Sequence, residues 1–586
     1  MKLKYVNIAN FRSIKDIRFE FPQSGILILV GANNAGKSNI IRAINNVLGS
    51  DWFSSEKLED HDFYNRCKTN EIKISLTFDT GAVAGFKWWT NQGDYKGFKR
   101  LGVGQDTFMS NEFKEKCPCT YLGADRSFDR HTSFYDWTLI GKIRKAFHNR
   151  AAPLQSQLQE KYNELASVFD QVDGFTDFKD DFARYFQEMQ ADTPARLSID
   201  FKPFTPSNYF KTMHILATDP NQSDEPLDLS ELGEGSRNMV LLALLRSYTV
   251  NFRNTPDEIS GILALEEPEI YLHPQARRHL YKILRDIANN GIQVIISTHS
   301  SSFVDTEFFD SIGQVIKVQD DEEPNKMHTS LVLVSKSMLV AQCRNTGVPA
   351  NKVCEANITE FYKTTSNHRL NESFFAKFLI LVEGETEELT LPELLVAECI
   401  DCDLQGISII AVKGKNQIPK YWRLFSQYKT PIMVVFDNDD DGTDANGQMR
   451  AKRKSNLNLQ SCFGLELDEI IENIDIYKTI SCRSEPNTPL LILENDFETA
   501  LRKDFTRTFP GETALLDDWE AQAKDLIKPV GNQNKGQIAR FIARKMHETH
   551  PAYCPSFVRE IASIVKTQLF MDTETESEPD IEEVPF

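Results

Sequence analysis

A glycine-rich loop that directly follows a buried apolar strand constrains this chain more than any other feature. Residues 26–30 read ILILV, a continuous apolar run that predicts a strand covered on both faces. Residues 31–38 read GANNAGKS and match the pattern G-x-x-x-x-G-K-S, and an apolar-periodic helix is predicted from about Lys37 to Leu48. The backbone N–H groups of such a loop surround phosphates, so we expect this segment to bind ATP.

Single residues of this loop have expected roles. Glycines allow the backbone to curl around the phosphates. Lys37 would reach the β- and γ-phosphates, and the Ser38 hydroxyl would bind Mg²⁺. The residues of this segment that we expect to contact the nucleotide are Gly31, Asn33, Asn34, Gly36, Lys37, Ser38 and Asn39.

Two further segments are predicted to lie beside the loop. Residues 263–269 read LALEEPE, an apolar strand that ends in acids, and the apolar run 292–297 is soon followed by His299. The carboxyl ends of parallel strands meet at one edge of a sheet. We therefore expect Glu266 to hold the Mg²⁺ hydration shell, Glu267 to orient the attacking water and His299 to sense the γ-phosphate. The alternatives are a solvated helix start for the acids and a structural role for the histidine.

A fourth segment completes a recognisable order. Residues 232–237 read LGEGSR and open an apolar helix predicted over 235–252, whose N-terminus could bind phosphate. The four segments in this order resemble the ABC-type ATPases of the SMC and RecF-like branch, over residues 1–310. Residues 232–237 resemble a degenerate form of the signature loop of that family.

This resemblance implies further contacts with the nucleotide. Gly233 and Gly235 of the signature-like loop would take part in binding, although Gly233 stands where the family has serine. Arg12, within the segment Asn10–Ser13, resembles an N-terminal arginine of the family that touches nucleotide. In such ATPases two heads enclose two ATP molecules, so the resemblance implies a homodimer or a higher homo-oligomer.

A second α/β unit is predicted to begin near residue 375. Residues 378–382 (FLILV) predict a buried strand that ends at Glu383, and a helix is expected from about Glu385 to Cys399. Glu387 lies four residues after Glu383, and the two share a helix face if the helix has begun by Glu383. These carboxylates are candidate ligands of a Mg²⁺ or Mn²⁺ ion.

A second pair of acids follows another predicted strand. Residues 432–436 (IMVVF) are followed by Asp437 and Asp439, which are two positions apart, so their carboxylates can point the same way. Together with Glu383 they predict a site for divalent metal that could cleave a phosphodiester. The alternative is a solvated acidic turn over 437–441.

The two acidic motifs together resemble the Toprim fold of topoisomerases, primases and OLD (overcoming lysogenization defect) nucleases, over about residues 375–560. In OLD nucleases a further acidic segment and a lysine complete the site. The sequence LENDFE resembles the former, with Glu494 and Glu498 as candidate metal ligands, either of which could point inward. Lys535 resembles the lysine and could stabilise the pentavalent phosphate or the leaving oxygen, unless it is a surface charge.

The domain organisation follows from these segments. We expect an α/β protein in which an ABC-type (SMC/RecF-like) P-loop ATPase domain, residues 1–370, precedes a Toprim domain, residues 371–570. A helical insertion is expected at about 140–200 and is a possible dimerisation region. Residues 571–586 are acidic and predicted to be disordered. The polar segments 320–326 and 363–373 are candidate linkers, and the domain boundary is placed near 370.

Charge and composition indicate which partners the chain can bind and where in the cell it is expected. The formal net charge is −19, whereas domains that bind nucleic acid are usually basic, so contact with DNA would need a local basic surface. Arg450, Lys452, Arg453 and Lys454 form such a cluster, and Lys413 and Lys415 flank Gly414; phosphate contact and a solvated face are both open for these residues. The ten cysteines include no two CxxC units that could pair as a zinc site, and no uncharged apolar run approaches the ~20 residues of a membrane span. We expect a cytoplasmic protein with reduced thiols and no membrane contact.

The resemblance to the OLD family implies a function. The chain would be an ATP-regulated, divalent-metal-dependent DNA endonuclease or nickase that acts in antiphage defence. Its partner could be a helicase-like subunit, as in Gabija systems, or a reverse transcriptase with its noncoding RNA, as in retrons. One alternative is a Toprim nuclease that acts as a toxin on RNA or tRNA. Another is a RecF- or SMC-like repair ATPase whose Toprim unit is not catalytic. A topoisomerase is disfavoured because no region resembles a DNA-breakage domain with a nucleophilic tyrosine.

Overall fold

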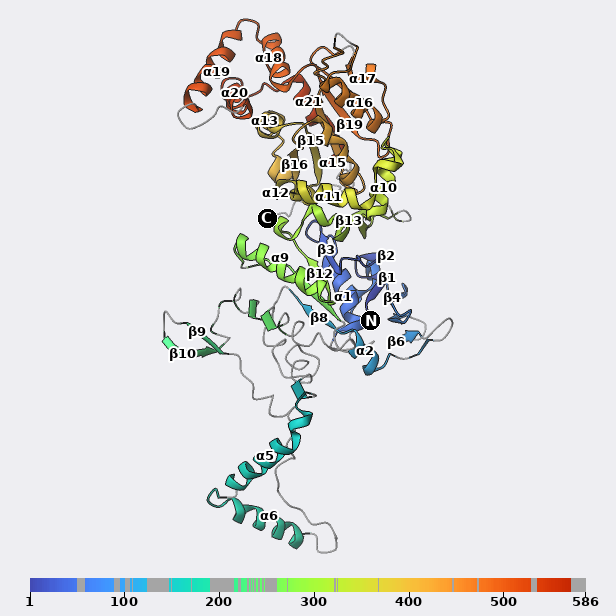
Figure 1. The fold of residues 1–586 in the computed structure, drawn as a ribbon, viewed down its shortest axis with the longest axis vertical. Coiled ribbons are helices and arrows are strands. Elements are labelled where there is room, and N and C mark those ends of the chain that lie inside the picture. Colours follow the sequence, from blue (N-terminus) through green and yellow to red (C-terminus); the bar gives the residue numbers. More distant parts are fainter. Residues whose placement is uncertain are drawn as a thin grey trace, which may run out of the picture.

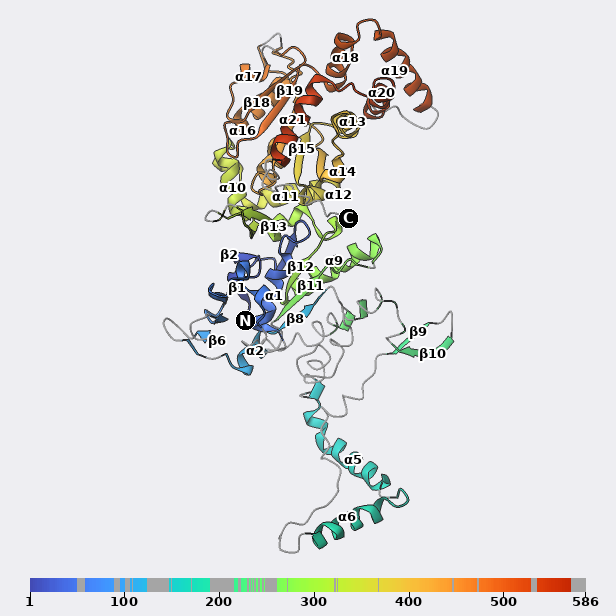
Figure 2. The ribbon, with the colours of Figure 1, turned by 180° about the vertical axis from the view of Figure 1, so that it is seen from behind.

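The chain forms two α/β bodies stacked along the long axis of the molecule, with a helical arm that projects from one end (Figure 1). We call residues 1–333 the N-terminal body and residues 378–570 the C-terminal body; the view from behind shows the same stacking (Figure 2). The computed structural model describes all residues except 50–57, 89–94, 101–105, 108, 124–146, 149, 170, 190–215, 220–222, 229–230, 232, 234–235, 237–238, 241–242, 245–246, 248–260, 271, 321–322, 324, 367, 445–446, 472–473, 528–534 and 571–586.

The N-terminal body is built on a six-stranded sheet in which one edge strand is antiparallel and the other strands are parallel. Residues 26–30 and 293–297 are buried at every position, as expected for strands that are covered on both faces. In order across the sheet, the strands are β14 (Met327–Leu333), β13 (Ile312–Gln319), β3 (Ile26–Val30), β12 (Gln293–Ser297), β11 (Ile262–Glu266) and β8 (Cys119–Leu122).

A second, antiparallel sheet packs against the same body. Helix α1 (Lys37–Leu48) lies between the two sheets, because its apolar residues share one core with strands of both. Alternating burial along 72–78 fits a strand with one covered face. In order, the strands are β2 (Ile14–Glu20), β1 (Leu3–Phe11), β4 (Ile72–Phe78), β5 (Val83–Trp88), β6 (Tyr95–Arg100) and β7 (Asp106–Thr107).

The C-terminal body holds a five-stranded sheet in which only the last edge strand is antiparallel. The order is β16 (Ile407–Ala411), β15 (Phe378–Val382), β17 (Ile432–Asp437), β19 (Pro489–Leu493) and β18 (Tyr477–Ser481). The chain leaves β15 toward β16 on one side and returns to β17 on the other. Ligands of open α/β sheets bind at such a switch point, beyond the carboxyl ends of the strands.

Helices cover the sheets and join the bodies. The arm consists of α5 (Gln155–Phe169) and α6 (Phe175–Met189), within the predicted helical insertion (Figure 1). No described helix is long and apolar enough to cross a membrane, and the ten cysteines are free thiols. The other helices are α2 (Asn111–Lys116), α9 (Pro274–Asn289), α10 (Lys336–Asn345), α11 (Glu355–Thr365), α12 (His368–Glu372), α13 (Glu385–Leu395), α14 (Cys402–Gln405), α15 (Ile418–Phe425), α16 (Ala451–Phe463), α17 (Leu467–Ile471), α18 (Phe497–Thr508), α19 (Thr513–Ile527), α20 (Lys535–Thr549) and α21 (Ser556–Phe570), and a small hairpin is formed by β9 (Leu216–Asp219) and β10 (Ser223–Asp228).

The parallel sheets and their helices confirm the predicted α/β class. Strands β3 and β15 and helix α1 have the predicted bounds, whereas α13 ends at Leu395 and continues as a short 3₁₀ turn over Val396–Glu398. The helix predicted over 235–252 falls largely outside the described residues, and the acidic tail 571–586 lies outside them completely.

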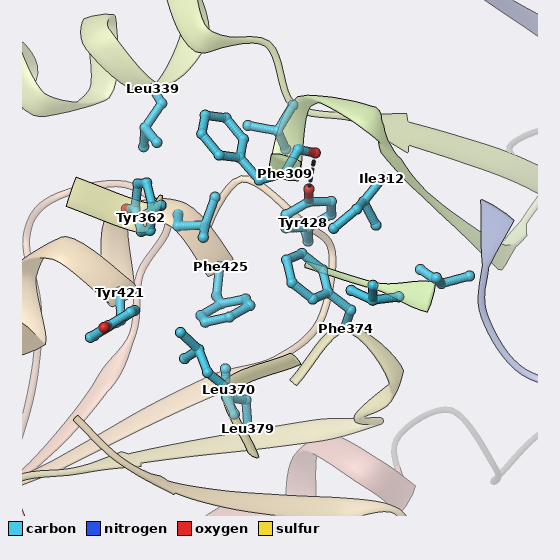
Figure 3. Packing of buried hydrophobic residues seen from close by; sticks show 14 of the residues in the cluster. Phe309, Ile312, Leu339, Tyr362, Leu370, Phe374, Leu379, Tyr421, Phe425 and Tyr428 are labelled. Atoms are coloured by element: carbon cyan, nitrogen blue, oxygen red, sulfur yellow. Dashed lines mark hydrogen bonds between the residues drawn. The ribbon is translucent and has the colours of Figure 1, made fainter. Parts of the chain in front are cut away.

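The segment 363–373 is not an exposed linker, contrary to one interpretation of its polar sequence. It holds the end of α11 and the short α12, and both Leu370 and Asn371 are buried. One hydrophobic cluster continues from Phe309 and Leu339 through Leu370 to Phe425 of the C-terminal body (Figure 3). The two bodies therefore share a core at the place where the boundary was expected.

Candidate active sites

The glycine-rich loop begins at the carboxyl end of β3, and its backbone requires glycine at two positions. Gly31 has φ 146° and Gly36 has φ 110°, in a region that other residues rarely adopt. A Cβ atom at Gly31 would lie 2.1 Å from the carbonyl oxygen of Val315, and one at Gly36 would lie 2.3 Å from Thr329 Oγ1. The loop is thus held close against β13 and β14, and it leads directly into the N-terminus of α1, which attracts phosphate.

Lys37 is buried within this loop. Its Nζ donates hydrogen bonds to the carbonyl oxygens of Gly31, at 2.8 Å, and Ala32, at 2.9 Å. Burial lowers the pKa of Lys37 to about 8, and the charges of Glu267 and Glu269 act in the opposite direction. The ammonium group therefore sits on the loop at the place where phosphates would be bound.

Other predicted nucleotide contacts differ in their placement. Asn33 and Asn34 are exposed at the tip of the loop, and Ser38 is half-buried at the start of α1. Asn39 instead donates a hydrogen bond to Ser13 Oγ at 2.8 Å. Arg12 forms an ion pair with the buried Asp62, at 2.9 Å, so both of these side chains stabilise the turn between β1 and β2. Gly233 is exposed, and Gly235 lies outside the described residues.

The predicted acids and histidine come together at the same edge of the sheet. Strands β3, β12 and β11 are neighbours, so the loop, His299 and Glu266 follow adjacent strand ends. Glu266 is 6% exposed, and its Oε1 has no hydrogen-bond partner among the described residues. Glu267 Oε1 lies 3.9 Å from His299 Nε2, and burial together with the charge of Lys37 lowers the pKa of His299. A neutral imidazole beside Glu267 can accept or donate a hydrogen bond to a bound phosphate or water.

Glu269, which the sequence analysis did not single out, holds this arrangement. It is 6% exposed, and its Oε1 accepts hydrogen bonds from Thr298 Oγ1, at 2.7 Å, and from the backbone N–H of His299, at 2.8 Å. The third acid of the Glu-Glu-Pro-Glu sequence was the only available sign of this role. Glu269 thus orients the segment that carries His299.

We expect Glu269→Ala to lower kcat for ATP hydrolysis about tenfold, because two buried donors lose their acceptor. Glu269→Gln keeps an acceptor oxygen and should retain most of the activity. Steady-state phosphate release measures both variants. Equal loss in the two would mean that the charge of Glu269, and not its hydrogen bonds to Thr298 and His299, is what matters.

A second set of acids meets at the carboxyl edge of the C-terminal sheet. Glu383 follows β15, Asp437 ends the neighbouring strand β17, and Glu387 lies in the first turn of α13. The helix begins at Glu385, so the condition for Glu383 and Glu387 to share a helix face is not met. Glu387 is brought back to the strand end in another way, because its Oε2 accepts a hydrogen bond from the N–H of Gly384 at 3.2 Å.

These carboxylates are crowded and buried. Burial, followed by the charges of Glu387 and Glu383, raises the pKa of Asp437 to about 9, and burial raises that of Glu387 to about 7. Burial also raises the pKa of Glu383, against the lowering effect of Lys415. Carboxyl groups this close cannot all be charged unless a cation lies among them.

The carboxylate of Asp439, a predicted metal ligand, is paired with two lysines. Its Oδ1 is paired with Lys415 and its Oδ2 with Lys452, at 2.7 Å. Lys415 is 5% exposed and also donates to Asn456 Oδ1 at 3.1 Å. Lys415 and Lys452, considered above for contact with DNA phosphate, are therefore engaged with the acidic turn, and Arg453 likewise pairs with Asp440 at 3.1 Å.

The remaining candidates lie at different distances from this cluster. Glu498 accepts a hydrogen bond from Thr386 Oγ1 at 3.2 Å, and its charge acts on Glu387. Glu494 is not brought into the cluster, because its carboxylate pairs with Lys503 at 2.6 Å. Lys535 is exposed at the first position of α20. A Cβ on the following residue, Gly536, would lie 3.2 Å from the carbonyl oxygen of Glu385, so α20 begins beside the start of α13.

The donor set fits a hard divalent cation. Glu383 Oε2 and Asp437 Oδ1 are buried without a hydrogen-bond partner among the described residues, and such orphaned carboxylate oxygens are typical ligands of Mg²⁺ and Mn²⁺. Within the same described part of the chain, no group of three histidine, cysteine, aspartate or glutamate side chains is already arranged to hold an ion.

Glu498 and Glu494 provide a matched pair of variants. We expect Glu498→Gln to lower nuclease activity about ten- to hundredfold, because Glu498 lies against Thr386 and Glu387, close to the proposed ligands. Glu494→Gln should stay within about twofold of the unchanged protein, since it breaks an ion pair with the half-exposed Lys503. Cleavage rates at saturating Mg²⁺ compare the two, and the reverse order would place Glu494 in the site instead.

The fold and the two sites define a P-loop ATPase joined to a Toprim domain. A family model described as AAA ATPase domain matches residues 1–119 and 111–304. A model described as the Toprim domain of overcoming lysogenization defect protein-like proteins matches residues 374–439, which include Glu383, Asp437 and Asp439.

Curated relatives extend the similarity over most of the chain. The OLD nuclease of Thermus scotoductus is 25% identical over 499 residues, which cover 79% of this chain and 89% of the relative. The Old nuclease of Escherichia phage P2 is 25% identical over 497 residues, 75% and 77% of the two chains. The endonuclease GajA of Bacillus cereus is 24% identical over 231 residues, 37% and 32% of the two chains. The chain belongs to the OLD family and is an enzyme with an ATPase domain and a Toprim nuclease domain.

Proposed function

We propose that the chain is a DNA endonuclease or nickase that depends on a divalent metal and is controlled by ATP. The observation that carries the proposal is the meeting of Glu383, Glu387 and Asp437 at one strand edge, with two buried carboxylate oxygens that lack partners. Like charges in such a position are retained when a cation binds there.

The residues of the nuclease site would have separate roles. Glu383 and Asp437 would hold Mg²⁺ or Mn²⁺, and Glu387 and Glu498 would support the ion from beside α13. Such an ion activates water and stabilises the leaving oxygen of a phosphodiester when it is bound. Lys535, at the exposed start of α20, would approach the scissile phosphate from solvent, where a cation stabilises developing negative charge.

The ATPase domain would act as a switch with two heads. Lys37 and the N-terminus of α1 would bind the phosphates, Ser38 and Glu266 would hold Mg²⁺, and Glu267 and His299 would act on the attacking water and the γ-phosphate. We propose that two chains pair through these heads. The core that the two bodies share supports control of the nuclease by ATP, because a change at one body is transmitted to the other through packed side chains.

Cleavage of supercoiled plasmid by the purified protein tests the proposal. We expect nicked or linear product with Mg²⁺ or Mn²⁺, none with EDTA, and a rate that changes between ATP and no nucleotide. A parallel reaction with tRNA separates DNA cleavage from an RNA-directed toxin. Cleavage of RNA alone would replace our substrate assignment, and no cleavage of either would favour a repair ATPase with a non-catalytic Toprim domain.

We also propose a role in antiphage defence, in keeping with the OLD family. The partner could be a helicase-like subunit or a reverse transcriptase with noncoding RNA. Plating of phage on cells that express the protein, alone and with its neighbouring genes, tests this role. Equal plating on cells that carry Asp437→Asn would show that the nuclease site is not involved.

A further inference from the structure

The segment that follows the ATP-facing strand β12 also touches the C-terminal body. After His299 and Ser300 the chain forms a short 3₁₀ turn, Ser301–Phe303. A second such turn follows at Thr306–Ser311. We call residues 304–306, which connect the first turn to the start of the second, the junction segment. Val304, the first residue of the junction segment, thus lies five positions after His299.

Asn371 of α12 holds the junction segment from the opposite side. Its Oδ1 accepts hydrogen bonds from the N–H of Thr306, at 3.1 Å, and from Thr306 Oγ1, at 2.6 Å. Its Nδ2 donates to the carbonyl oxygen of Val304 at 2.8 Å. Asn371 is 6% exposed and Thr306 is 0% exposed, so these bonds are made away from water. Asn371 thus fixes the junction segment by bonding to the residues on both sides of Asp305, Val304 and Thr306.

Further contacts hold the segment after β12 against the end of α11 and the C-terminal body. Ser366 Oγ donates to Asp305 Oδ1 at 2.6 Å. Tyr428 of the C-terminal body donates to the carbonyl oxygen of Phe309 at 3.2 Å, the dashed bond in Figure 3. The ring of Phe374 packs edge-on against that of Tyr428, with centroids 5.3 Å apart. Because these side chains are closely packed, a displacement of the junction segment would also displace its neighbours in the C-terminal body.

The path from Asn371 to the nuclease site is short. Helix α12 is followed by the 3₁₀ turn Ser373–Phe375, which leads into β15, and Glu383 follows the end of β15. Phe374, between Asn371 and the strand, is 2% exposed and belongs to the shared core. The segment from Asn371 to Glu383 is thus packed apart from the exposed Glu372 and Lys377, and strand β15 would carry a shift at its beginning to the carboxylate that follows its end.

We propose that Asn371 is the positioning residue through which the nucleotide state sensed at His299 sets the position of Glu383. The proposal deepens the proposed function and rests on its control of the nuclease by ATP. Asn371 contacts neither nucleotide nor metal. Its effect is on the coupling between two sites, which is a free energy separate from the activity of either one.

Variants at Asn371 test the proposal in the full-length protein. The quantity measured is the coupling ratio, the plasmid-cleavage rate with ATP divided by the rate without nucleotide, at saturating Mg²⁺. We expect Asn371→Ala to bring this ratio close to one, while kcat for ATP hydrolysis stays within about threefold of the unchanged protein. Asn357→Ala is the matched control, because Asn357 also bonds to backbone groups, the N–H of Cys354 and the carbonyl oxygen of Lys352, but lies exposed on α11 away from the junction segment. It should leave the ratio unchanged.

A second pair covers the case in which Asn371→Ala does not fold. Thr306→Val keeps the shape of the side chain and removes its hydrogen bond to Asn371, whereas Thr306→Ser keeps the hydroxyl. We expect the valine variant to lose most of the coupling ratio and the serine variant to keep it. A merely structural role would change stability in both variants and leave the ratio of any folded protein intact.

The outcomes separate the two proposals. If cleavage by the unchanged protein does not respond to ATP, the control by ATP in the proposed function is wrong. If it responds and the Asn371→Ala or Thr306→Val protein responds equally, only the role of Asn371 is wrong. Loss of ATP hydrolysis together with the coupling ratio would place Asn371 in the support of His299 alone and would also overturn the inference.

Discussion

Asp437→Asn is expected to abolish metal-dependent cleavage, by about a thousandfold or more, and to make the metal-free protein more stable. Cleavage is lost because the amide cannot replace a charged oxygen ligand of Mg²⁺. Stability rises because Asp437, crowded by Glu383 and Glu387, must take up a proton to stay buried at neutral pH, whereas the nearly isosteric asparagine is neutral without that proton. Plasmid cleavage and thermal unfolding in EDTA measure the two effects, and ATP hydrolysis should be unchanged.

The pH dependence of stability gives a separate check on the same residue. The folded protein raises the pKa of Asp437 from its usual 3.8 to about 9, so between these values the folded state binds a proton that the unfolded state has lost. The free energy of unfolding of the unchanged protein should therefore fall as pH rises from about 4 to about 9. This slope should be shallower in Asp437→Asn. Parallel slopes in the two proteins would contradict the crowding of the three carboxylates.

Added Mg²⁺ should stabilise the unchanged protein more than it stabilises Asp437→Asn. If Mg²⁺ binds at Asp437 as proposed, it should raise the melting temperature of the unchanged protein at neutral pH and do so far less in Asp437→Asn. Asp444→Asn offers a control just after the acidic turn, because Asp444 Oδ1 accepts an exposed hydrogen bond from the N–H of Gln448. A melting temperature that responds equally to Mg²⁺ in all three proteins would remove Asp437 from the metal site.

Glu267→Gln should lower kcat for ATP hydrolysis about a hundredfold and leave ATP binding nearly intact. Glu267 lies beside His299 and near Lys37, where it can orient water against the γ-phosphate, and glutamine keeps the shape without the charge. Lys37→Ala is the contrasting variant, because it removes the buried ammonium that rests on the phosphate loop and should lose binding itself.

Fluorescent-nucleotide titration and phosphate release separate binding from hydrolysis in these two variants. A Glu267→Gln protein that hydrolyses ATP at the normal rate would mean that another group orients the water. A Lys37→Ala protein that binds ATP normally would contradict the placement of the phosphates on this loop.

The local sequence pattern was sufficient to place the site residues that follow buried strands in both domains. The runs ILILV and FLILV have no polar residue to break them, so their ends and the residues that follow could be placed from sequence. Neighbouring parallel strands then bring Glu266 and His299 to one edge, and Glu383 and Asp437 to another. The sequence pattern did not predict the hydrogen bonds of Glu269, because they depend on how the Thr298–His299 turn is folded.

The remaining features of the sites depend on contacts between residues far apart in the sequence, so they could not be predicted from local pattern. Lys415 reaches Asp439 from a loop 24 residues away and Asn456 from 41 residues away, and nothing in the local sequence indicates these pairings. Glu494 and Glu498 were separated only by their partners, Lys503 and Thr386. The polar sequence around 363–373 indicated exposure, yet Leu370, Asn371 and Ser373 are buried.

The shared core between the two bodies has a consequence for how such chains can be divided or recombined. A cut near residue 370 would leave Phe309 and Leu339 on one fragment and Tyr428 and Phe425 on the other, each with a broad apolar surface exposed to water. Such surfaces favour aggregation over independent folding. A nuclease domain transplanted from another chain would need to bring an apolar face that matches Phe309 and Leu339.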